Sequence, residues 1–462
     1  MASAILASLF HPSEVLALVQ YKLAPKTKFD YSNDKTRERL YHHLNMTSRS
    51  FAAVIQDLDE ELKDAVSSLH PIWICQATSH IDPARFLTTP DPASPNNSPT
   101  QPILSCCCRQ LICLFYLILR GLDTIEDDMT IDLETKIPYL KTFHEIIYQK
   151  GWTFTKNGPN EKDRQLLVEF DVVIEGFLKL KPAYQTIIAD ITKRMGNGMA
   201  HYATAGIHVD TIADYDEYCH YVAGLVGLGL SEMFSACGFE SPMVAKRKDL
   251  SNSMGLFLQK TNITRDYLED LRDDRRFWPK EIWGLYAEKM EDLVKPENCD
   301  KAKQCLSHMV WNAMEHIKDV LEYLEMIKNP SCFKFCAIPQ VMAIATLNML
   351  HTNYKIFTHE NIKIRKGETV WLMKESDTIE KVAAIFRLYA REINNKSNPL
   401  DPHFVNIGVL CGEIEQICVS KYPGSTAELA RLQAGVMAGT SGSVITAAAV
   451  VAGAVVLKST FA

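Results

Sequence analysis

Apolar residues recur at three- and four-residue spacing along most of this chain, which is the pattern of helices that bury one face. The pattern predicts helices over residues 161–177, 183–204, 217–236, 254–271, 302–327 and 379–395. Alternation typical of strands is scarce, and for its clearest candidate, residues 361–370, a short β-like excursion and an ordered loop both remain open. The chain is therefore expected to be mainly helical.

One stretch interrupts this pattern. Residues 51–66 carry helical spacing, but residues 67–112 do not, and five prolines within 88–102 exclude both helix and central strand there. A long stretch without regular structure is uncommon inside a compact domain, so we interpret 67–112 as an atypical insertion and expect disorder at least over 88–102. Ser105 is placed to cap a strongly apolar helix that restarts over 106–128.

The C-terminal part is uncharged from Gly435 to Leu457, and about 20 apolar residues suffice to span a bilayer. We predict a transmembrane tail anchor over 435–457, joined to the body by a linker at 421–434, with a buried tail helix as the alternative. The N-terminal apolar run lacks a basic region, so no secretory signal is expected.

The composition agrees with one large helical domain, placed at residues 1–66 and 113–420, because 47% of the 462 residues are hydrophobic. A net charge of −7 gives no support for nucleic-acid binding. The thirteen cysteines lack the CxxC pairs of metal sites, and several lie in apolar stretches. This usage indicates reduced thiols facing the cytosol.

Two acidic clusters carry the clearest chemical signal. Each has carboxylates at positions i, i+3 and i+4, which share one helix face and repel one another. They are Asp123, Glu126 and Asp127 in the first cluster, and Asp266, Glu269 and Asp270 in the second. A shared Mg²⁺ relieves such repulsion, takes oxygen ligands and bridges to phosphates. A solvated acidic face is the commoner explanation of a single cluster, but the pair favours a metal site that clamps diphosphates.

Arginines accompany these clusters. Arg120 lies one turn before Asp123, Arg265 directly precedes Asp266, and Arg49 lies among hydroxyl residues where a helix is expected to begin. A guanidinium matches the geometry of phosphate oxygens, so these side chains are candidate diphosphate ligands, with ordinary ion pairs as the alternative.

A glycine-rich apolar segment follows Tyr218. Three glycines at 224, 227 and 229 cost about 1 kcal/mol each in a helix interior, so close helix packing or a bulky apolar ligand must offset them. Tyr218 and Tyr221 could offer a phenol as proton donor or acceptor, or a ring beside a carbocation. The basic patch at Lys363 and Arg365 serves either solubility or a dinucleotide phosphate. The chain has no GxGxxG, which excludes a Rossmann site.

At these residues the chain resembles the squalene synthases, the farnesyl-diphosphate farnesyltransferases of sterol biosynthesis. The likeness runs from about residue 11 to 421, apart from 67–112. The segments that carry it are LDTIEDDM (122–129), YCHYVAGLVG (218–227), QKTNITRDYLED (259–270), FCAIPQ (335–340) and KIRKG (363–367). It implies an all-α isoprenoid-synthase bundle around a central cavity.

The resemblance also implies a reaction in two halves. Two farnesyl diphosphates condense head to head to presqualene diphosphate, which is then rearranged and reduced by NADPH to squalene. Tyr218 would carry the proton abstraction that closes the cyclopropane, with the released diphosphate as a second candidate base. The protein would be a monomer in the endoplasmic reticulum membrane, with its catalytic domain facing the cytosol.

Each implied role falls on particular residues. Mg²⁺ would be held by Asp123, Glu126, Asp127, Asp266 and Asp270. Diphosphate would be bound by Arg49, Arg120, Arg265 and Arg275. NADPH would meet Lys363 and Arg365, and the pocket would be lined by Phe51, Phe335, Cys336 and Gln340.

Two alternatives remain. Phytoene or dehydrosqualene synthases share the acidic clusters and condense without reduction. A catalytically impaired product is the second, because residues 67–112 have no counterpart in the resembled family. Their composition is typical of translated non-coding sequence, so we favour a retained intron or an erroneous gene model over a genuine insertion.

Overall fold

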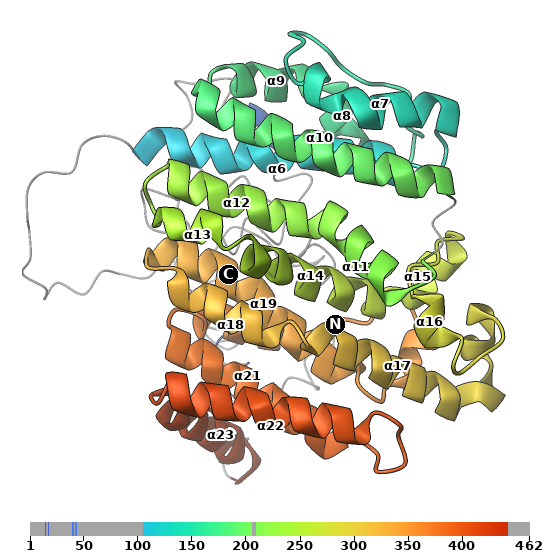
Figure 1. Cartoon of the computed structure of the whole chain (residues 1–462), viewed down its shortest axis with the longest axis vertical. Coiled ribbons are helices and arrows are strands. Elements are labelled where there is room, and N and C mark those ends of the chain that lie inside the picture. Colours follow the sequence, from blue (N-terminus) through green and yellow to red (C-terminus); the bar gives the residue numbers. More distant parts are fainter. Residues whose placement is uncertain are drawn as a thin grey trace, which may run out of the picture.

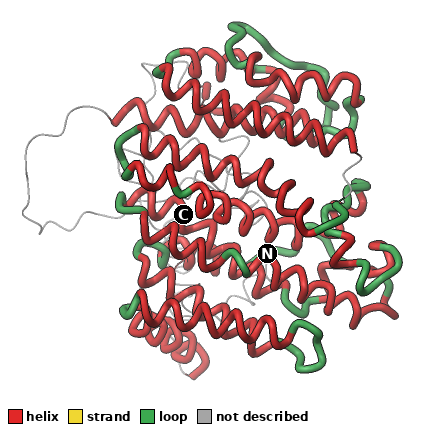
Figure 2. The backbone as a smooth tube through the Cα atoms, viewed as in Figure 1, coloured by secondary structure: helices red, strands yellow, loops and turns green. Residues whose placement is uncertain are grey.

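The computed structural model describes residues 14, 17, 39, 40, 42, 43, 105–205 and 209–441, with side chains left out at 105–110, 205 and 435–441. Within this part of the chain every regular element is a helix, as Figure 2 shows. The prediction of an all-α fold is confirmed. Residues 361–365 form a loop and residues 366–370 begin a helix, so the loop interpretation is correct for the first half of this segment only.

The helices are stacked in layers that follow the order of the chain (Figure 1). The first layer contains α6 (Ser105–Asp127), α7 (Leu133–Ile146), α8 (Arg164–Val168), α9 (Phe170–Leu178) and α10 (Pro182–Ala205). The second contains α11 (Ile212–Cys219), the π-helix η1 (His220–Gly224), α12 (Leu225–Ala236), α13 (Pro242–Lys246), α14 (Lys248–Arg265), α15 (Tyr267–Arg272) and α16 (Lys280–Trp283).

The remaining layers complete the stack. The third contains the 3₁₀-helices η2 (Met290–Val294), η3 (Pro296–Asn298) and η4 (Tyr354–Phe357) with α17 (Cys299–Met314), α18 (Ile317–Met326), α19 (Pro330–Leu350) and α20 (Lys366–Lys374). The last contains α21 (Ile379–Lys396), α22 (Phe404–Lys421) and α23 (Ser425–Ser441). Each predicted helical segment is helical, although four of the six are divided by a break or a π-helix.

The central helices are buried on nearly all sides. Every residue from 111 to 119 of α6 is buried, which identifies α6 as a core helix rather than an amphipathic surface helix. Helix α19 is long and apolar enough to cross a membrane, but most of it is buried inside the protein. It is therefore a core helix too. The predicted membrane span at 435–457 lies outside the residues whose side chains are described.

The described parts of the insertion and of the predicted linker are mainly helical, which agrees with the helix expected to restart over 106–128. The last residues assigned to the insertion, 105–112, form the beginning of α6, where Leu111 and Ile112 are buried. The rest of the insertion, 67–104, lies outside the described residues. The predicted linker at 421–434 is mostly the first part of α23, which packs against α21 and buries Leu429 and Leu432. Apolar burial therefore includes residues 111–112 of the insertion and part of 425–434.

The glycine-rich segment is explained by close packing. A Cβ added at Gly227 would lie 2.3 Å from the backbone oxygen of Ser251, and one at Gly255 would lie 2.6 Å from Cα of Gly224. At Gly229 it would lie 2.6 Å from the ring of Phe115. The contacts at Gly227 and Gly255 let η1 and α12 approach α14 backbone to backbone, and the one at Gly229 lets α12 approach the ring of Phe115 in α6. Packing, not an apolar ligand, accounts for the glycines.

This packing predicts that Gly227→Ala destabilises the chain. Overpacking of a core costs typically 1–3 kcal/mol, which exceeds the gain of about 1 kcal/mol in helix propensity. Gly412→Ala in α22 is the matched control, because a Cβ there meets nothing within 4 Å. Thermal melting should show a lower melting temperature for Gly227→Ala and an equal or higher one for Gly412→Ala. Equal behaviour of the two variants would contradict the packing argument.

Candidate active site

The first acidic cluster lies in the last turns of α6. Carboxylate oxygens of Asp123, Glu126 and Asp127 all come within 4.8 Å of one another. Asp123 and Glu126 are buried, whereas Asp127 is partly exposed. The predicted i, i+3, i+4 face therefore exists, and it brings three carboxylates into one small volume.

Burial of these acids changes how readily they ionise. It raises the pKa of Asp123 to about 7 and that of Glu126 to about 8, and the charge of Asp127 adds to both shifts. The C-terminal end of a helix carries partial negative charge, which disfavours carboxylates in the last turns. The ionised form of the cluster is therefore unfavourable in free energy unless cations bind nearby.

Two cations of the first layer partly offset this charge. Arg120 donates from Nη1 to Asp123, and its Nε and Nη2 both bind Oδ2 of Asp163, with an Nε–Oδ2 distance of 2.7 Å. Lys136 of α7 is buried and donates from Nζ to the backbone oxygen of Glu126 at 2.7 Å. Lys136 thereby caps one of the last carbonyl groups of α6.

Asp128, the fourth acid of this sequence run, has a different role. Its carboxylate accepts hydrogen bonds from the backbone N–H of Thr130 (2.8 Å) and of Gly158 (2.9 Å) and from Nδ2 of Asn157 (3.0 Å). Burial would raise the pKa of Asp128, but a hydrogen bond from Oγ1 of Thr130 (2.6 Å) together with these bonds lowers it. Asp128 thus ends α6 and fixes the loop before α8.

The second cluster lies where α14 gives way to α15. Asp266 sits at the junction, and its carboxylate binds Arg265 at two points, Nε–Oδ1 and Nη2–Oδ2, both 2.8 Å. The backbone N–H of Asp270 still bonds the carbonyl of Asp266 at 2.9 Å, which preserves the spacing of one turn. Glu269 instead accepts from the backbone N–H of Asn361 at 3.1 Å.

Arg275 joins the two clusters. Its Nη1 lies 3.1 Å from Oδ1 of Asp127, and its Nη2 lies 3.1 Å from Oδ1 of Asp270. The structure thus brings acids from α6 and α15 to one guanidinium. Burial raises the pKa of Asp270 well above its usual range, although Arg275 opposes the shift. The Nε of Arg275 is buried without a hydrogen-bond partner among the described residues, so one donor remains for another group.

Tyr218, at the end of α11, lies beside this junction. Its ring stacks on Phe277 with centroids 4.8 Å apart and meets Tyr202 edge-on at 5.2 Å. The guanidinium of Arg275 lies over the other ring of the stack, 5.7 Å from the centroid of Phe277. Burial and the charges of Glu126 and Asp127 raise the pKa of Tyr218 well above its usual range, so its phenol stays protonated.

The predicted pocket residues of α19 lie farther along α14. Gln340 is buried and donates from Nε2 to the carbonyl of Met254 at 3.2 Å, while its Oε1 has no partner within the described part of the chain. At 1.5 Å per residue, Met254 lies roughly 18 Å along the helix from Asp266. Cys336 is buried, and the ring of Phe335 meets that of Phe234 edge-on, with the ring centroids 6.1 Å apart.

The basic residues after η4 lie on a loop bound to the second cluster through Glu269 and Asn361. Arg365 binds Glu14, with an Nη2–Oε1 distance of 2.7 Å, and Glu368 at 3.1 Å. Lys363 donates to Oδ1 of Asn361 at 3.3 Å. Both cations line a cavity of about 420 Å³ that also contains Lys396, Glu392 and Trp371.

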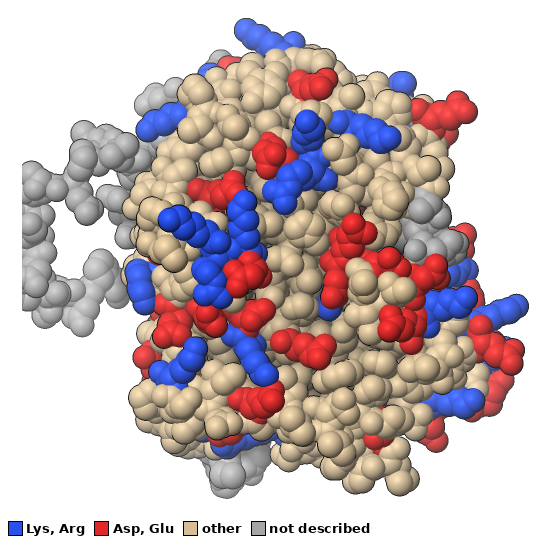
Figure 3. All heavy atoms as spheres, viewed as in Figure 1, with Lys and Arg blue, Asp and Glu red and all other residues tan. Residues whose placement is uncertain are grey.

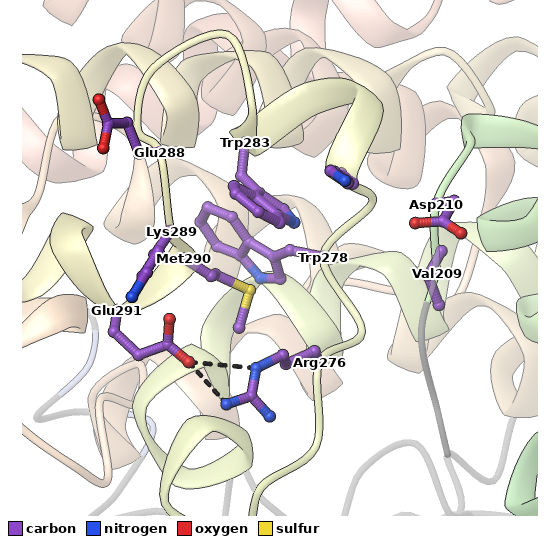
Figure 4. A pocket seen from close by; sticks show the side chains of 10 residues that line it. Val209, Asp210, Arg276, Trp278, Trp283, Glu288, Lys289, Met290 and Glu291 are labelled. Atoms are coloured by element: carbon purple, nitrogen blue, oxygen red, sulfur yellow. Dashed lines mark hydrogen bonds and ion pairs between the residues drawn. The ribbon is translucent and has the colours of Figure 1, made fainter. Parts of the chain in front are cut away.

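Arg276, which follows Arg275 in the sequence, does not face the acidic clusters. It lines a separate cavity of about 350 Å³ with Trp278, Trp283 and Met290, and its guanidinium binds Glu291 at 3.1 and 2.6 Å (Figure 4). Of the two adjacent arginines, Arg275 alone turns toward the acidic clusters. On the face seen in Figure 3, acidic side chains gather right of centre, where Figure 1 places α11, α14 and α15.

Two predicted site residues, Arg49 and Phe51, lie outside the described residues. Sequence reasoning did not identify Asp163, Lys136 or the connecting role of Arg275. Asp163 occurs in a charged loop, Glu161-Lys-Asp-Arg164, whose pattern is typical of a solvated surface. Only the long-range contact with Arg120 distinguishes it.

The residues present fit Mg²⁺. The three carboxylates within 4.8 Å of one another supply the oxygen donors that this ion prefers, and Asp127 remains partly open to solvent. The raised pKa values of Asp123 and Glu126 show that their negative charges lack sufficient compensation without a cation. The unpartnered Nε of Arg275 adds a donor suited to a phosphate oxygen. Asp123, Glu126 and Asp127 would hold the metal from one side, with Asp270 facing them across Arg275.

Fold and site together are those of an all-α isoprenoid synthase, and comparisons with known proteins specify the family. The family described as Squalene/phytoene synthase matches residues 97–368. Squalene synthase of Schizosaccharomyces pombe is 44% identical over 418 residues, covering 89% of this chain and 81% of that protein. Squalene synthase of Homo sapiens is 44% identical over 397 residues, covering 85% and 83%.

A solved structure agrees with these relatives. The complex of TcSQS with the ligand E5700 is 35% identical, has a TM-score of 0.71 and covers 84% of this chain and 99% of that one. The chain therefore belongs to the squalene/phytoene synthase family. The resemblance found in the sequence, the isoprenoid-synthase fold and the assignment to this class of enzymes are confirmed.

The raised pKa values predict how the stability of the metal-free chain depends on pH. Asp123 and Glu126 keep their protons in the folded chain up to about pH 7 and about pH 8, whereas in the unfolded chain both ionise near pH 4. The folded state binds more protons between these limits. The melting temperature in EDTA should therefore fall as the pH rises from about 4 to about 8, and this contribution should level off at higher pH.

Asp123→Asn removes one titrating group and should make this fall shallower, whereas Asp190→Asn on the exposed face of α10 should not. Mg²⁺ should raise the melting temperature most at the higher pH, because it binds ionised carboxylates. Thermal melting across pH measures both effects. A fall that is equally steep in Asp123→Asn and the parent chain would contradict the assignment.

Proposed function

We propose that this chain is a squalene synthase, which condenses two farnesyl diphosphates through presqualene diphosphate and reduces the product with NADPH. The main observation behind the proposal is that Arg275 binds both Asp127 of the first cluster and Asp270 of the second. A site between these groups would present two sets of carboxylates and a guanidinium to the same diphosphate. The family of the chain supports this substrate class.

Mg²⁺, when bound, would supply the positive charge that accepts a leaving diphosphate. The arginines would contribute differently. Arg275 has an available Nε donor, and Arg120 and Arg265 are held beside the clusters by carboxylates that a metal would share. The second acids, Asp266 and Asp270, would complete the metal set from the α14–α15 junction.

Tyr218 would face the reacting carbons. The raised pKa makes a tyrosinate unfavourable, so we propose that the phenol passes its proton to a diphosphate oxygen as it takes one from the substrate. The stacked rings of Tyr218 and Phe277 would exclude water and stabilise a nearby cation through their π faces.

For the reductive half we propose that NADPH binds at the loop of Lys363 and Arg365, beside the cavity of about 420 Å³. Hydride donation is the chemistry that NADPH supplies. The cations fit a phosphate, but Arg365 must exchange part of its bonding with Glu14 and Glu368. The contact between Asn361 and Glu269 would keep this loop next to the diphosphate site. Phe335, Cys336 and Gln340 would line the apolar path along α14.

The location of the chain is part of the same proposal. An uncharged segment at 435–457, which begins within α23, would anchor it in the endoplasmic reticulum membrane, with the catalytic body in the cytosol. Fractionation of cells with the full chain and with a chain ending at residue 434 tests this, because the anchor predicts loss from membranes on truncation. Membrane retention of the shortened chain would contradict it.

The products formed from farnesyl diphosphate test the function. The purified chain with Mg²⁺ should release squalene only when NADPH is present, and mass spectrometry identifies the product. Asp270→Asn should lower the rate about 100-fold or more, since it removes a metal ligand. Condensation with no use of NADPH would support the phytoene or dehydrosqualene type instead, and no product from the parent chain would contradict the proposal.

Two further variants test the NADPH site and the insertion separately. Lys363→Ala should reduce squalene formation while presqualene diphosphate still accumulates, because only the second half uses NADPH. A variant without residues 67–112 tests the insertion. The shortened form keeps residues 113–127 of α6, which include Arg120 and Asp123, so both forms should be active. Activity of the shortened form alone would show that the insertion impairs the enzyme.

A further inference from the structure

We propose that Asp163 is a positioning residue that holds Arg120 and thereby keeps Asp123 available to metal. This inference rests on the proposed function and extends it to a side chain outside both acidic clusters. Asp163 ends the loop before α8, and its carboxylate is almost fully buried, with 1% of the side chain exposed.

The geometry of the contact is specific. Arg120 places Nε 2.7 Å from Oδ2 of Asp163, and its Nη2 binds the same oxygen, while Nη1 turns to Asp123. One guanidinium thus serves two carboxylates with different edges. The side chain of Asp163 makes no capping bond to α8, so its described hydrogen bonds all go to Arg120.

The loop that carries Asp163 is fixed by the first cluster's own helix. Asp128 accepts from Nδ2 of Asn157 at 3.0 Å and from the backbone N–H of Gly158 at 2.9 Å. Helix α6 therefore provides Asp123, Arg120 and the attachment for the loop that returns Asp163 to Arg120. Both ends of this set of contacts are therefore attached to α6, which holds the guanidinium of Arg120 in one orientation.

The charges explain what this orientation achieves. A guanidinium paired with Asp123 alone would compete with a metal for that carboxylate. Because Asp163 takes the Nε edge, Arg120 stays bound when Asp123 turns to a cation, and its Nη1 becomes available to a diphosphate oxygen. The carboxylate of Asp163 is itself incompletely bonded: its Oδ1 is buried without a hydrogen-bond partner among the described residues.

The inference predicts that Asp163→Asn weakens metal binding through Arg120. In titrations of the full chain in detergent with Mg²⁺ and inorganic diphosphate, half-saturation should need ~10-fold more Mg²⁺ than in the parent chain. Asp190→Asn, which loses an exposed helix pair with Arg194, is the matched control and should leave the titration unchanged. Circular dichroism verifies that each variant is folded.

A double variant separates positioning from a general loss of charge or fold. If Asp163 acts through Arg120, Asp163→Asn should have little further effect in an Arg120→Gln background. An equal shift in both backgrounds, or no shift in the single variant, would overturn the inference while leaving the proposed function intact. Failure of the parent chain to bind Mg²⁺ and diphosphate at all would overturn both.

Discussion

Repulsion among buried carboxylates is the constraint on which the arrangement of this site depends. Asp123, Glu126 and Asp127 share the unfavourable end of α6, and Asp270 faces them from α15. Burial raises the pKa of Asp123, Glu126 and Asp270, which indicates that each carries a free-energy penalty when ionised. The cations near them are therefore part of the site.

Each cluster has its own arginine, and a third arginine joins them. Arg120 and Arg265 bind carboxylates next to them in sequence, whereas Arg275 connects helices from two layers of the fold. Removal of one partner from such a set leaves a buried charge uncompensated, which is more damaging than the loss of one exposed ion pair. The loop before α8 and the α14–α15 junction must therefore hold their charged side chains in contact with their partners.

Close helix packing provides that placement. Gly227 and Gly255 let η1 and α12 lie directly on α14, and the π-helix η1 begins two residues after Tyr218. A π-helix widens one turn and is frequent at functional sites. The glycines therefore stabilise the geometry that sets the ring of Tyr218 beside Phe277 and Arg275, although they contact no charged group of the clusters themselves.

The sequence predicted what depends on local periodicity and less of what depends on long-range contacts. The first acidic face and the helices around it follow from three- and four-residue spacing, so they could be predicted. Three other features depend on how segments distant in the sequence meet. They are the end of α14 at Asp266, the hydrogen bond between Glu269 and Asn361, and the hydrogen bonds between Asp163 and Arg120. Spacing along one helix contains no information about them, and the raised pKa of Tyr218 likewise depends on its burial and on the nearby charges of Glu126 and Asp127.

The most direct measurement is a crystal structure of the chain with Mn²⁺ and inorganic diphosphate, with the metal located by its anomalous scattering. The account predicts metal bound to Asp123 and Asp127, diphosphate between the two clusters, and Nε of Arg275 bonded to a diphosphate oxygen. Metal and diphosphate bound away from both clusters, with Arg275 still joining Asp127 to Asp270, would contradict it.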